Sequence, residues 1–350
     1  MAKTGVLSRR VLATVWLVVG AAMVAVPVWL GWTRWQPVLM GHPLMLGLTI
    51  GCGLLGFVAL AWAFASLVLG DRSEDDETRP RTERQRARRA SRRIALAVPA
   101  LFVCVLLVGA LAWSRPFPAS PVAVAAMRSG GDVRVSDRLT WFEMASTARD
   151  DDDQVVRPTT GLVFVPGARV DPRAYANVLR PLARAGYLVT VLKEPFGVSF
   201  VDAGHPERVM AAHPEIAQWV VAGHSLGGVT AASFADGTPT VGDARVAGLV
   251  LWASYPARRL ERPDLRVTSV AGERDGLSTP ATIDAAKDDL PPDTTYVVVP
   301  GAVHSWFGDY GDQPGDGTPT GDRAAAQAQI TKATRAVLAA VTPKPPAKKK

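Results

Sequence analysis

Cysteine is scarce in this sequence of 350 residues, which contains two cysteines. Cys52 and Cys104 both lie in apolar stretches near the N-terminus, and no cysteine follows them. The longer C-terminal part of the chain therefore has no disulfide, no thiolate nucleophile and no cysteine-ligated metal site. We expect both thiols to be small buried side chains that pack between helices.

Charge is missing from three long segments near the N-terminus. Residues 11–32, 44–70 and 94–113 contain no Asp, Glu, Lys or Arg. An uncharged apolar run of about 18 residues or more is typical of a membrane-spanning helix. A signal peptide is the alternative for the first segment, but that segment is longer than the roughly 7–15 apolar residues of such signals. We predict an integral membrane region over residues 1–113, and its uncharged spans argue against a transport role.

The distribution of arginine predicts how this region is oriented. Residues 71–93 carry nine arginines and six acidic residues, whereas the segment between the first two spans carries only Arg34. Because Lys and Arg accumulate in cytoplasmic segments and acidic residues contribute little, residues 71–93 and the N-terminus are expected in the cytoplasm. Three spans then place everything after Trp113 on the outer face of the plasma membrane.

The net charge of +7 does not indicate a nucleic-acid partner. The positive excess lies in the N-terminus, in residues 71–93 and in the lysines of residues 342–350, so the remainder of the chain is slightly acidic. These basic groups are topology signals and a solvated tail rather than a binding face.

The chain after the last span begins with a proline-rich stretch and then becomes regular. Residues 114–131 are interpreted as a linker, and "DVRVSDRLTWFEM" (132–144) is typical of an antiparallel strand pair. From residue 161, valine-rich runs alternate with helical segments, as expected for a parallel sheet that is buried on both faces. The runs are "GLVFVPG", "YLVTVL", "QWVVAG", "VAGLVLW", "LRVTSVAG" and "TTYVVVPG". We predict an α/β domain with a doubly wound, mostly parallel sheet over residues 132–341.

One of these runs ends at a serine flanked by small residues. Gly223-His224-Ser225-Leu226-Gly227 fits the pattern G-x-S-x-G between a predicted strand and a predicted helix. A nucleophile on such a turn needs small neighbours, which Gly223, Gly227 and Gly228 supply. Ser225 is therefore the predicted nucleophile, and His224 is expected to face away from it and to pack in the core.

A serine hydroxyl needs a base, and the base needs an orienting acid. In sheets of this kind the chain order is serine, acid, histidine. His304 is the one histidine after Ser225 and follows the last predicted strand. Asp275, before Gly276 in the loop after the preceding strand, is the predicted acid, and Glu273 is its rival in the same loop.

A tetrahedral oxyanion also needs two backbone N–H donors. Leu226, directly after the nucleophile, is one predicted donor. Ala168, in the loop "FVPGARVD" after the first parallel strand, is the other, with Arg169 as the alternative. Arg169 could instead serve as a contact for an anionic substrate group or as a surface cation.

Residues from about 161 to 341 resemble the α/β-hydrolase superfamily. The resemblance is carried by "GHSLGG", "GERDGL" and "HSWFGDYGDQPGDG", and is strongest to a small bacterial branch with little or no lid. The sequence departs from many relatives in having Pro-Gly-Ala in place of His-Gly-X at the oxyanion loop. Residues 253–264 are too few for a cap domain, so an open site is expected, with residues 193–207 as a partial wall.

The resemblance implies hydrolysis of an ester or a related acyl bond. We therefore predict a membrane-anchored serine hydrolase acting on a small-molecule or lipid ester, with no metal and no organic cofactor. Two alternatives remain open at this point. One is an acyltransferase that uses the same three residues, and the other is a non-catalytic interaction module with a hydrolase-like fold.

Overall fold

A computed structural model describes residues 2–68 and 83–343 of the chain. The chain divides into two compact units, the first formed by Met1–Val38 and Leu44–Arg115 and the second by Leu39–Pro43 and Pro116–Lys350. The first part of the predicted cytoplasmic segment 71–93 and most of the predicted tail 342–350 lie outside the described residues.

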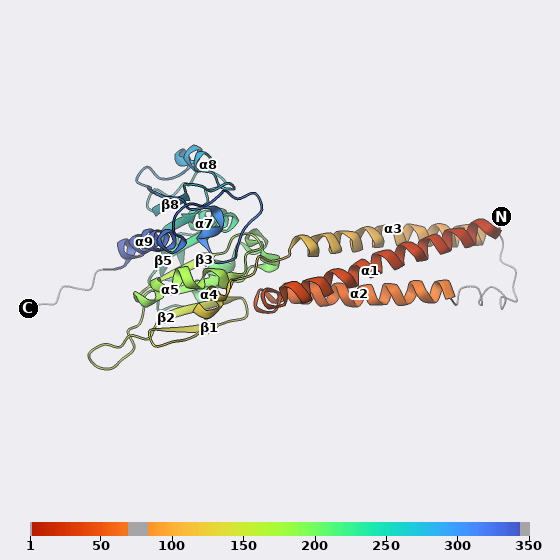
Figure 1. The fold of residues 1–350 in the computed structure, drawn as a ribbon, viewed down its shortest axis with the longest axis horizontal. Helices are drawn as coiled ribbons and strands as arrows, with labels where there is room; N and C mark the ends of the chain where they lie inside the picture. The colour runs from red at the N-terminus through yellow and green to blue at the C-terminus, as the bar shows by residue number, and fades with distance from the viewer. Residues whose placement is uncertain (1, 69–82, 344–350) are drawn as a thin grey trace, which may run out of the picture. The chain divides into compact units, whose positions relative to one another are not determined.

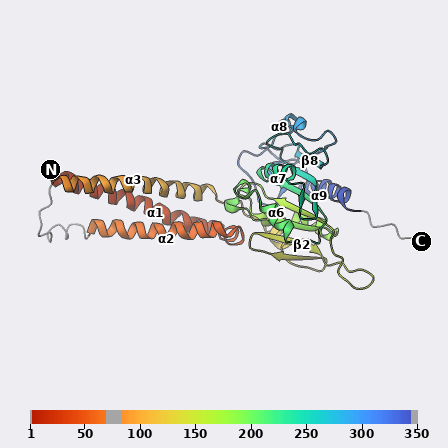
Figure 2. The ribbon, with the colours of Figure 1, turned by 180° about the vertical axis from the view of Figure 1, so that it is seen from behind.

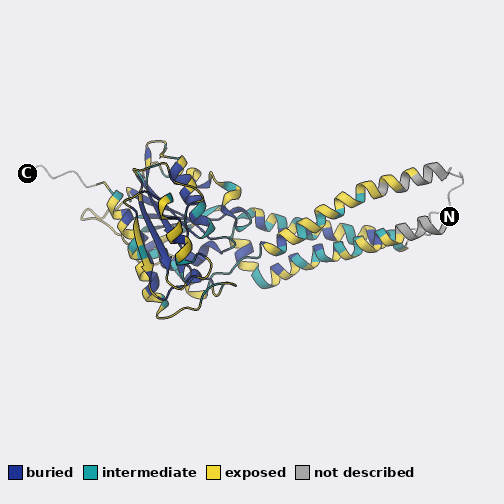
Figure 3. Cartoon of the chain, turned by 90° about the horizontal axis from the view of Figure 1, so that it is seen from above, coloured by how far each residue is buried: buried dark blue, intermediate teal, exposed yellow. Residues whose placement is uncertain are grey.

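The first unit contains long apolar helices (Figures 1 and 2). They are α1 (Ala2–Met40), α2 (Pro43–Val68) and α3 (Glu83–Trp113). Within the described residues, three stretches are long and apolar enough to cross a membrane, namely Arg10–Met40, Pro43–Val68 and Ile94–Trp113. Few of their residues are buried, as Figure 3 shows, and this low burial suits side chains that face lipid.

Helix α3 begins earlier than its apolar segment. Residues 83–93, expected to belong to a cytoplasmic loop, are helical and continuous with the span. The physical reason is composition, because "ERQRARRA" consists of residues with high helix propensity.

Small residues allow α1 and α2 to lie in contact. A side chain at Gly56 would place its Cβ 2.9 Å from the carbonyl oxygen of Gly20 and 2.6 Å from the Cβ of Met23. Cys52 is buried at the same contact, with Sγ 3.6 Å from the Met23 carbonyl oxygen, as expected for a packing thiol. Cys104 on α3 is only half-buried, so the expectation of burial is wrong for this residue.

The second unit is built on a mixed sheet of nine strands. The strand order is β1-β2-β4-β3-β5-β7-β8-β9, with β6 beside β7. The predicted antiparallel pair is confirmed as β1 and β2, and every neighbouring pair from β4 to β9 along this order is parallel. The strands are β1 (Val133–Asp137), β2 (Trp141–Ser146), β3 (Thr160–Val165), β4 (Leu188–Leu192), β5 (Gln218–His224), β6 (Thr240–Val241), β7 (Ala244–Trp252), β8 (Arg266–Gly272) and β9 (Thr295–Val299).

Helices cover both faces of this sheet, which confirms the doubly wound architecture. Alternate residues of β3 point to opposite sides: Leu162 and Phe164 join one core cluster and Val163 and Val165 the other. Helices α5 and α9 supply the first cluster, and α6 and α7 supply the second (Figures 1 and 2). Their bounds are α5 (Ala176–Arg184), α6 (His205–Ala211), α7 (Leu226–Gly237), α8 (Pro280–Ala285) and α9 (Arg323–Val341).

Residues 114–131, interpreted as a linker, include structure that packs against the domain. Helix α4 (Pro121–Ala126) lies within them, with Ala123 fully buried. Phe117 forms a bridge to Val170, donating its N–H to the Arg169 carbonyl oxygen and accepting the N–H of Asp171. This stretch therefore holds the loop after β3, the loop in which an oxyanion donor is predicted.

The segment between β7 and β8 contains no helix or strand in the part of the chain that the structure describes. It follows Trp252 and reaches β8 at Arg266 without leaving room for a separate cap domain. The predicted absence of a large lid is in keeping with this short connection.

Candidate active site

Ser225 lies on a sharp turn between β5 and α7. Its backbone has φ 53° and ψ −126°, a conformation that a residue with a side chain rarely adopts. The turn is held by the Ser225 N–H, which donates to the Trp252 carbonyl oxygen, and by the Ser254 hydroxyl, which donates to the Ser225 carbonyl oxygen. Ser225 is one of five described residues other than glycine with a positive φ, and its place between a strand and a helix is typical of a nucleophile elbow.

The glycines around Ser225 are required by close packing. A Cβ at Gly223 would lie 2.3 Å from the Gly227 carbonyl oxygen, and one at Gly227 would lie 2.2 Å from the Val165 carbonyl oxygen. A Cβ at Gly228 would meet the Ser254 side chain at 2.5 Å. The start of α7 is therefore pressed against the ends of its neighbouring strands, which leaves no space for side chains.

Gly227→Ala is expected to lower the free energy of unfolding by about 1–3 kcal/mol, because the new methyl group meets backbone that cannot move aside. Gly237→Ala is the matched control on the same helix, where an added Cβ has nothing within 4 Å. That control is expected to be neutral or stabilising by up to about 1 kcal/mol. Chemical denaturation of the full chain measures both, and equal effects would contradict the packing argument.

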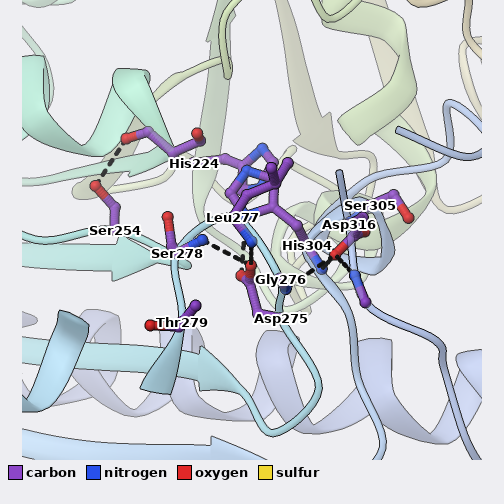
Figure 4. Close-up of polar contacts among 12 residues, drawn as sticks. His224, Ser254, Asp275, Gly276, Leu277, Ser278, Thr279, His304, Ser305 and Asp316 are labelled. Atoms are coloured by element: carbon purple, nitrogen blue, oxygen red, sulfur yellow. Dashed lines mark hydrogen bonds and ion pairs between the residues drawn. The ribbon is translucent and has the colours of Figure 1, made fainter. Parts of the chain in front are cut away.

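Asp275 and His304 come together from the ends of adjacent strands. Asp275 follows β8, and His304 begins the short 3-10 turn (His304–Phe307) after β9. The Asp275 Oδ2 lies 2.9 Å from the His304 Nδ1, and both side chains are buried. The other oxygen, Oδ1, accepts the backbone N–H groups of Leu277 and Ser278 at 2.8 and 2.7 Å (Figure 4). The carboxylate is thus aimed at the ring nitrogen that an orienting acid must contact.

The rival acid, Glu273, is engaged elsewhere. Its Oε2 accepts the backbone N–H of Gly301 at 2.7 Å. Glu273 therefore supports the turn after β9, and the geometry favours Asp275 as the partner of His304.

His304 lies beside the turn that carries Ser225. The ring of His224, the residue before Ser225, is 4.5 Å from the ring of His304. Among the described residues, however, no hydrogen bond joins the Ser225 hydroxyl to His304. Such contacts are often long in a free enzyme and shorten when substrate binds.

Asp316 connects the two loops that carry Asp275 and His304. Its Oδ1 accepts the backbone N–H groups of Gly276 and His304, and its Oδ2 accepts that of Ser305 at 2.8 Å (Figure 4). Burial alone would raise the pKa of Asp316, but the backbone N–H groups outweigh it and hold the pKa below its usual value. The sequence suggested no role for Asp316 beyond a place in the family-like segment that follows His304.

Asp316→Asn is expected to lower the melting temperature at pH 7, because hydrogen bonds to a charged acceptor contribute about 1–3 kcal/mol. A depressed folded pKa stabilises the protein above the unfolded value of about 3.9 and ceases to do so as the pH falls through the folded pKa. The difference between wild type and variant should therefore shrink as the pH falls below the unfolded value of about 3.9. Asp312→Asn, at an exposed position of the same segment, is the control. A difference that stays constant with pH would contradict this role for Asp316.

The two predicted oxyanion donors follow β3 and β5, which are neighbouring parallel strands. Within the described residues, the N–H groups of Ala168 and Leu226 donate no hydrogen bond, whereas the Arg169 N–H donates to the Gly197 carbonyl oxygen at 2.7 Å. Arg169 is thus already engaged, and Ala168 remains the better candidate. Residues 195–197 lie against this loop, in keeping with the partial wall expected from residues 193–207.

His224 does not face away from the site, so that expectation is wrong. Its ring is fully buried, as predicted, but it packs against His304 and stacks on Phe307 with centroids 5.7 Å apart. The Nδ1 of His224 is 2.9 Å from the hydroxyl of Tyr175. No sequence pattern marks Tyr175, because its contact depends on how η1 (Pro172–Tyr175) packs beneath the loop after β3.

Comparisons with known proteins identify a family for this domain. The model of a family described as "Alpha/beta hydrolase family" matches residues 161–329. The comparison with curated proteins returned no match.

Solved structures similar to the chain have low sequence identity. TT1662 from Thermus thermophilus is 14% identical, with a TM-score of 0.41, 59% of this chain covered and 99% of that chain. A Klebsiella pneumoniae protein described as a dienelactone hydrolase is 16% identical, with a TM-score of 0.42 and coverages of 57% and 92%. A mutant of the esterase rPPE is 13% identical, with a TM-score of 0.42 and coverages of 63% and 88%.

The matched residues begin just inside β3, include Ser225, Asp275 and His304, and end within α9. The domain that these residues form belongs to the α/β-hydrolase superfamily.

Proposed function

We propose that this chain is a membrane-anchored serine hydrolase that cleaves ester bonds through Ser225, His304 and Asp275. The observation that supports this most is the hydrogen-bonded pair of Asp275 and His304 next to a strained serine turn. These groups follow β8, β9 and β5, at the carboxyl ends of parallel strands where α/β sheets place their sites.

The proposed reaction proceeds through an acyl-enzyme. The Ser225 Oγ attacks the carbonyl carbon while His304 accepts its proton at Nε2, and Asp275 stabilises the resulting imidazolium. The N–H groups of Leu226 and Ala168 would donate to the oxyanion. His304 then protonates the leaving alcohol, and a water molecule, deprotonated by the same ring, releases the acid and restores Ser225.

The substrate class we propose is a small-molecule or lipid ester. The short connection from β7 to β8 leaves the site without a cap domain, which suits a site open to substrate. Two exposed apolar residues belong to segments around the proposed site. Phe200 lies in the proposed wall, and Leu277 is two residues after Asp275 in the sequence. Apolar side chains of this kind favour an acyl or alkyl group over a charged one.

We also propose that the domain lies on the outer face of the plasma membrane. The arginine-rich segment before the last span and the basic N-terminus support a cytoplasmic location for both. Three spans then carry the chain across the membrane before the domain begins.

Labelling by a fluorophosphonate probe tests the reaction and the location together. The full chain in membranes should be labelled, and peptide mapping should identify Ser225 as the modified residue. A membrane-impermeant form of the probe, added to intact cells that express the chain, should label it equally well. Absence of labelling in the folded wild-type chain would contradict the proposed function. Labelling only after cell lysis would contradict the proposed orientation and place the domain in the cytoplasm.

A further inference from the structure

A buried tyrosine–histidine pair links the loop after β3 to the neighbourhood of His304. Tyr175 and His224 are both fully buried. The Gly167 N–H donates to the Tyr175 hydroxyl at 2.9 Å, and the same hydroxyl oxygen is 2.9 Å from the His224 Nδ1. Gly167 directly precedes Ala168, so the contact lies next to a proposed oxyanion donor.

The Tyr175 hydroxyl can satisfy two hydrogen bonds at once. The Tyr175 oxygen accepts the Gly167 N–H, and its single proton needs an acceptor because an unsatisfied buried hydroxyl is costly. The His224 Nδ1 is the acceptor within reach. The other ring nitrogen of His224, Nε2, is buried and has no hydrogen-bond partner among the described residues, so the Tyr175 hydroxyl is the group that orients the ring.

His224 stays neutral in this setting. Burial lowers its pKa well below the usual value, and the adjacent His304 lowers the pKa further. The ring centroids of the two histidines are 4.5 Å apart. A neutral neighbour leaves His304 free to take up the proton, because two imidazolium rings at this distance would repel each other.

The loop after β3 is closely packed at this contact. A Cβ at Gly167 would lie 2.7 Å from the His224 Nδ1 and 3.2 Å from the Tyr175 hydroxyl. The carbonyl oxygen of Gly167 accepts the Val170 N–H, closing a turn around Ala168. The position of the Ala168 N–H thus depends on where the hydroxyl holds Gly167.

We infer that Tyr175 and His224 are positioning residues of the proposed reaction. The Tyr175 hydroxyl holds the Gly167–Ala168 backbone where the Ala168 N–H can meet the oxyanion, and it fixes the His224 ring against which His304 packs. This inference rests on the proposed serine hydrolase function. It adds to that function a single buried hydroxyl that sets the geometry of the oxyanion loop and of the base.

Tyr175→Phe tests the inference with little change in packing, because the ring that contacts Phe164 at 4.7 Å is kept. With p-nitrophenyl butyrate and the full chain in detergent, kcat should fall by about 10- to 100-fold, as expected for a small misplacement of catalytic groups. KM should stay within about twofold, because the lost interaction acts in the transition state. The rate constant of fluorophosphonate labelling should fall in parallel.

Thr334→Val is the matched control. It also removes a buried hydroxyl that accepts an N–H, that of the Trp252 side chain at 2.9 Å, but its hydrogen-bond partners lie on β7 and α9 and not in the loop after β3. The control should lose thermal stability to a similar degree while its kcat remains at the wild-type level. Equal kcat in Tyr175→Phe and wild type, or equal losses in the two variants, would overturn the inference.

A second pair of variants applies if Tyr175→Phe does not fold. His224→Asn keeps an acceptor near the position of Nδ1, whereas His224→Leu does not, so the asparagine variant should retain the higher kcat. The opposite order would overturn the inference. Failure of the proposed function gives a different result, since the wild-type chain itself would then not be labelled at Ser225.

Discussion

Alanine in place of Ser225 is expected to lower kcat for ester hydrolysis by about 10⁴-fold or more, because the variant has no oxygen to form the acyl-enzyme. Fluorophosphonate labelling should disappear with it. The structure supports a large effect, since Ser225 alone occupies the strained turn between β5 and α7. The measurement is steady-state hydrolysis of p-nitrophenyl butyrate by the full chain, with wild type and variant compared at equal folded concentration.

Ser233→Ala is the control for this experiment. Ser233 is an exposed serine on the same helix, α7, and its loss should change neither hydrolysis nor labelling. Relief of the strained backbone is not expected from Ser225→Ala, because alanine also has a Cβ. If the Ser225→Ala chain still hydrolyses the ester at the wild-type rate, the proposed mechanism is wrong.

Asparagine in place of Asp275 should lower kcat by about 10⁴-fold while leaving the fold intact. The amide is nearly the same size as the carboxylate, but it has no negative charge and so cannot stabilise the imidazolium of His304. The Oδ1 position can still accept the N–H groups of Leu277 and Ser278 if the amide nitrogen faces His304. That orientation presents a donor to Nδ1 and so imposes the wrong tautomer on the base.

Glu273→Gln is the matched comparison, because Glu273 is the other acidic residue of the loop after β8. It accepts the Gly301 N–H, a hydrogen bond that glutamine can also accept, so kcat should change little. Labelling and thermal melting of both variants separate loss of chemistry from loss of fold. A larger loss of kcat in Glu273→Gln than in Asp275→Asn would transfer the role of acid to Glu273.

Much of the fold was predictable because its signals are local in the chain. The valine-rich runs form β3, β4, β5, β7, β8 and β9, since strands buried on both faces need apolar residues at every position. The expected burial is wrong for β9, which ends the strand order and is mostly exposed. The uncharged segments form long helices for a similarly local reason, because their composition is that of a membrane span. Cys104 departs from expectation because burial depends on neighbouring segments, whereas residues 83–93 depart from it because their composition favours a helix.

The candidate site also contains residues that local sequence predicts and residues that only tertiary contacts bring together. Ser225 and its glycines were predictable, because a strand, a tight turn and a helix follow one another in the chain. The choice between Asp275 and Glu273 was not, since two acids in one loop differ only in which of them reaches His304. Tyr175 and Asp316 carry no pattern of their own, and their contacts join segments far apart in sequence.

The sequence by itself determined the division into an apolar helical region and an α/β domain, and the serine turn within that domain, because each is encoded by residues adjacent in the chain. The tertiary structure alone decided which groups meet at the ends of β3, β5, β8 and β9. Hydrogen bonds such as those of Asp316 to the His304 loop, and of Tyr175 to Gly167, exist only after the strands align. Their geometry is a property of the packed sheet, because nearly every residue type has the same backbone N–H group and the sequence does not show which of these groups an acceptor will meet.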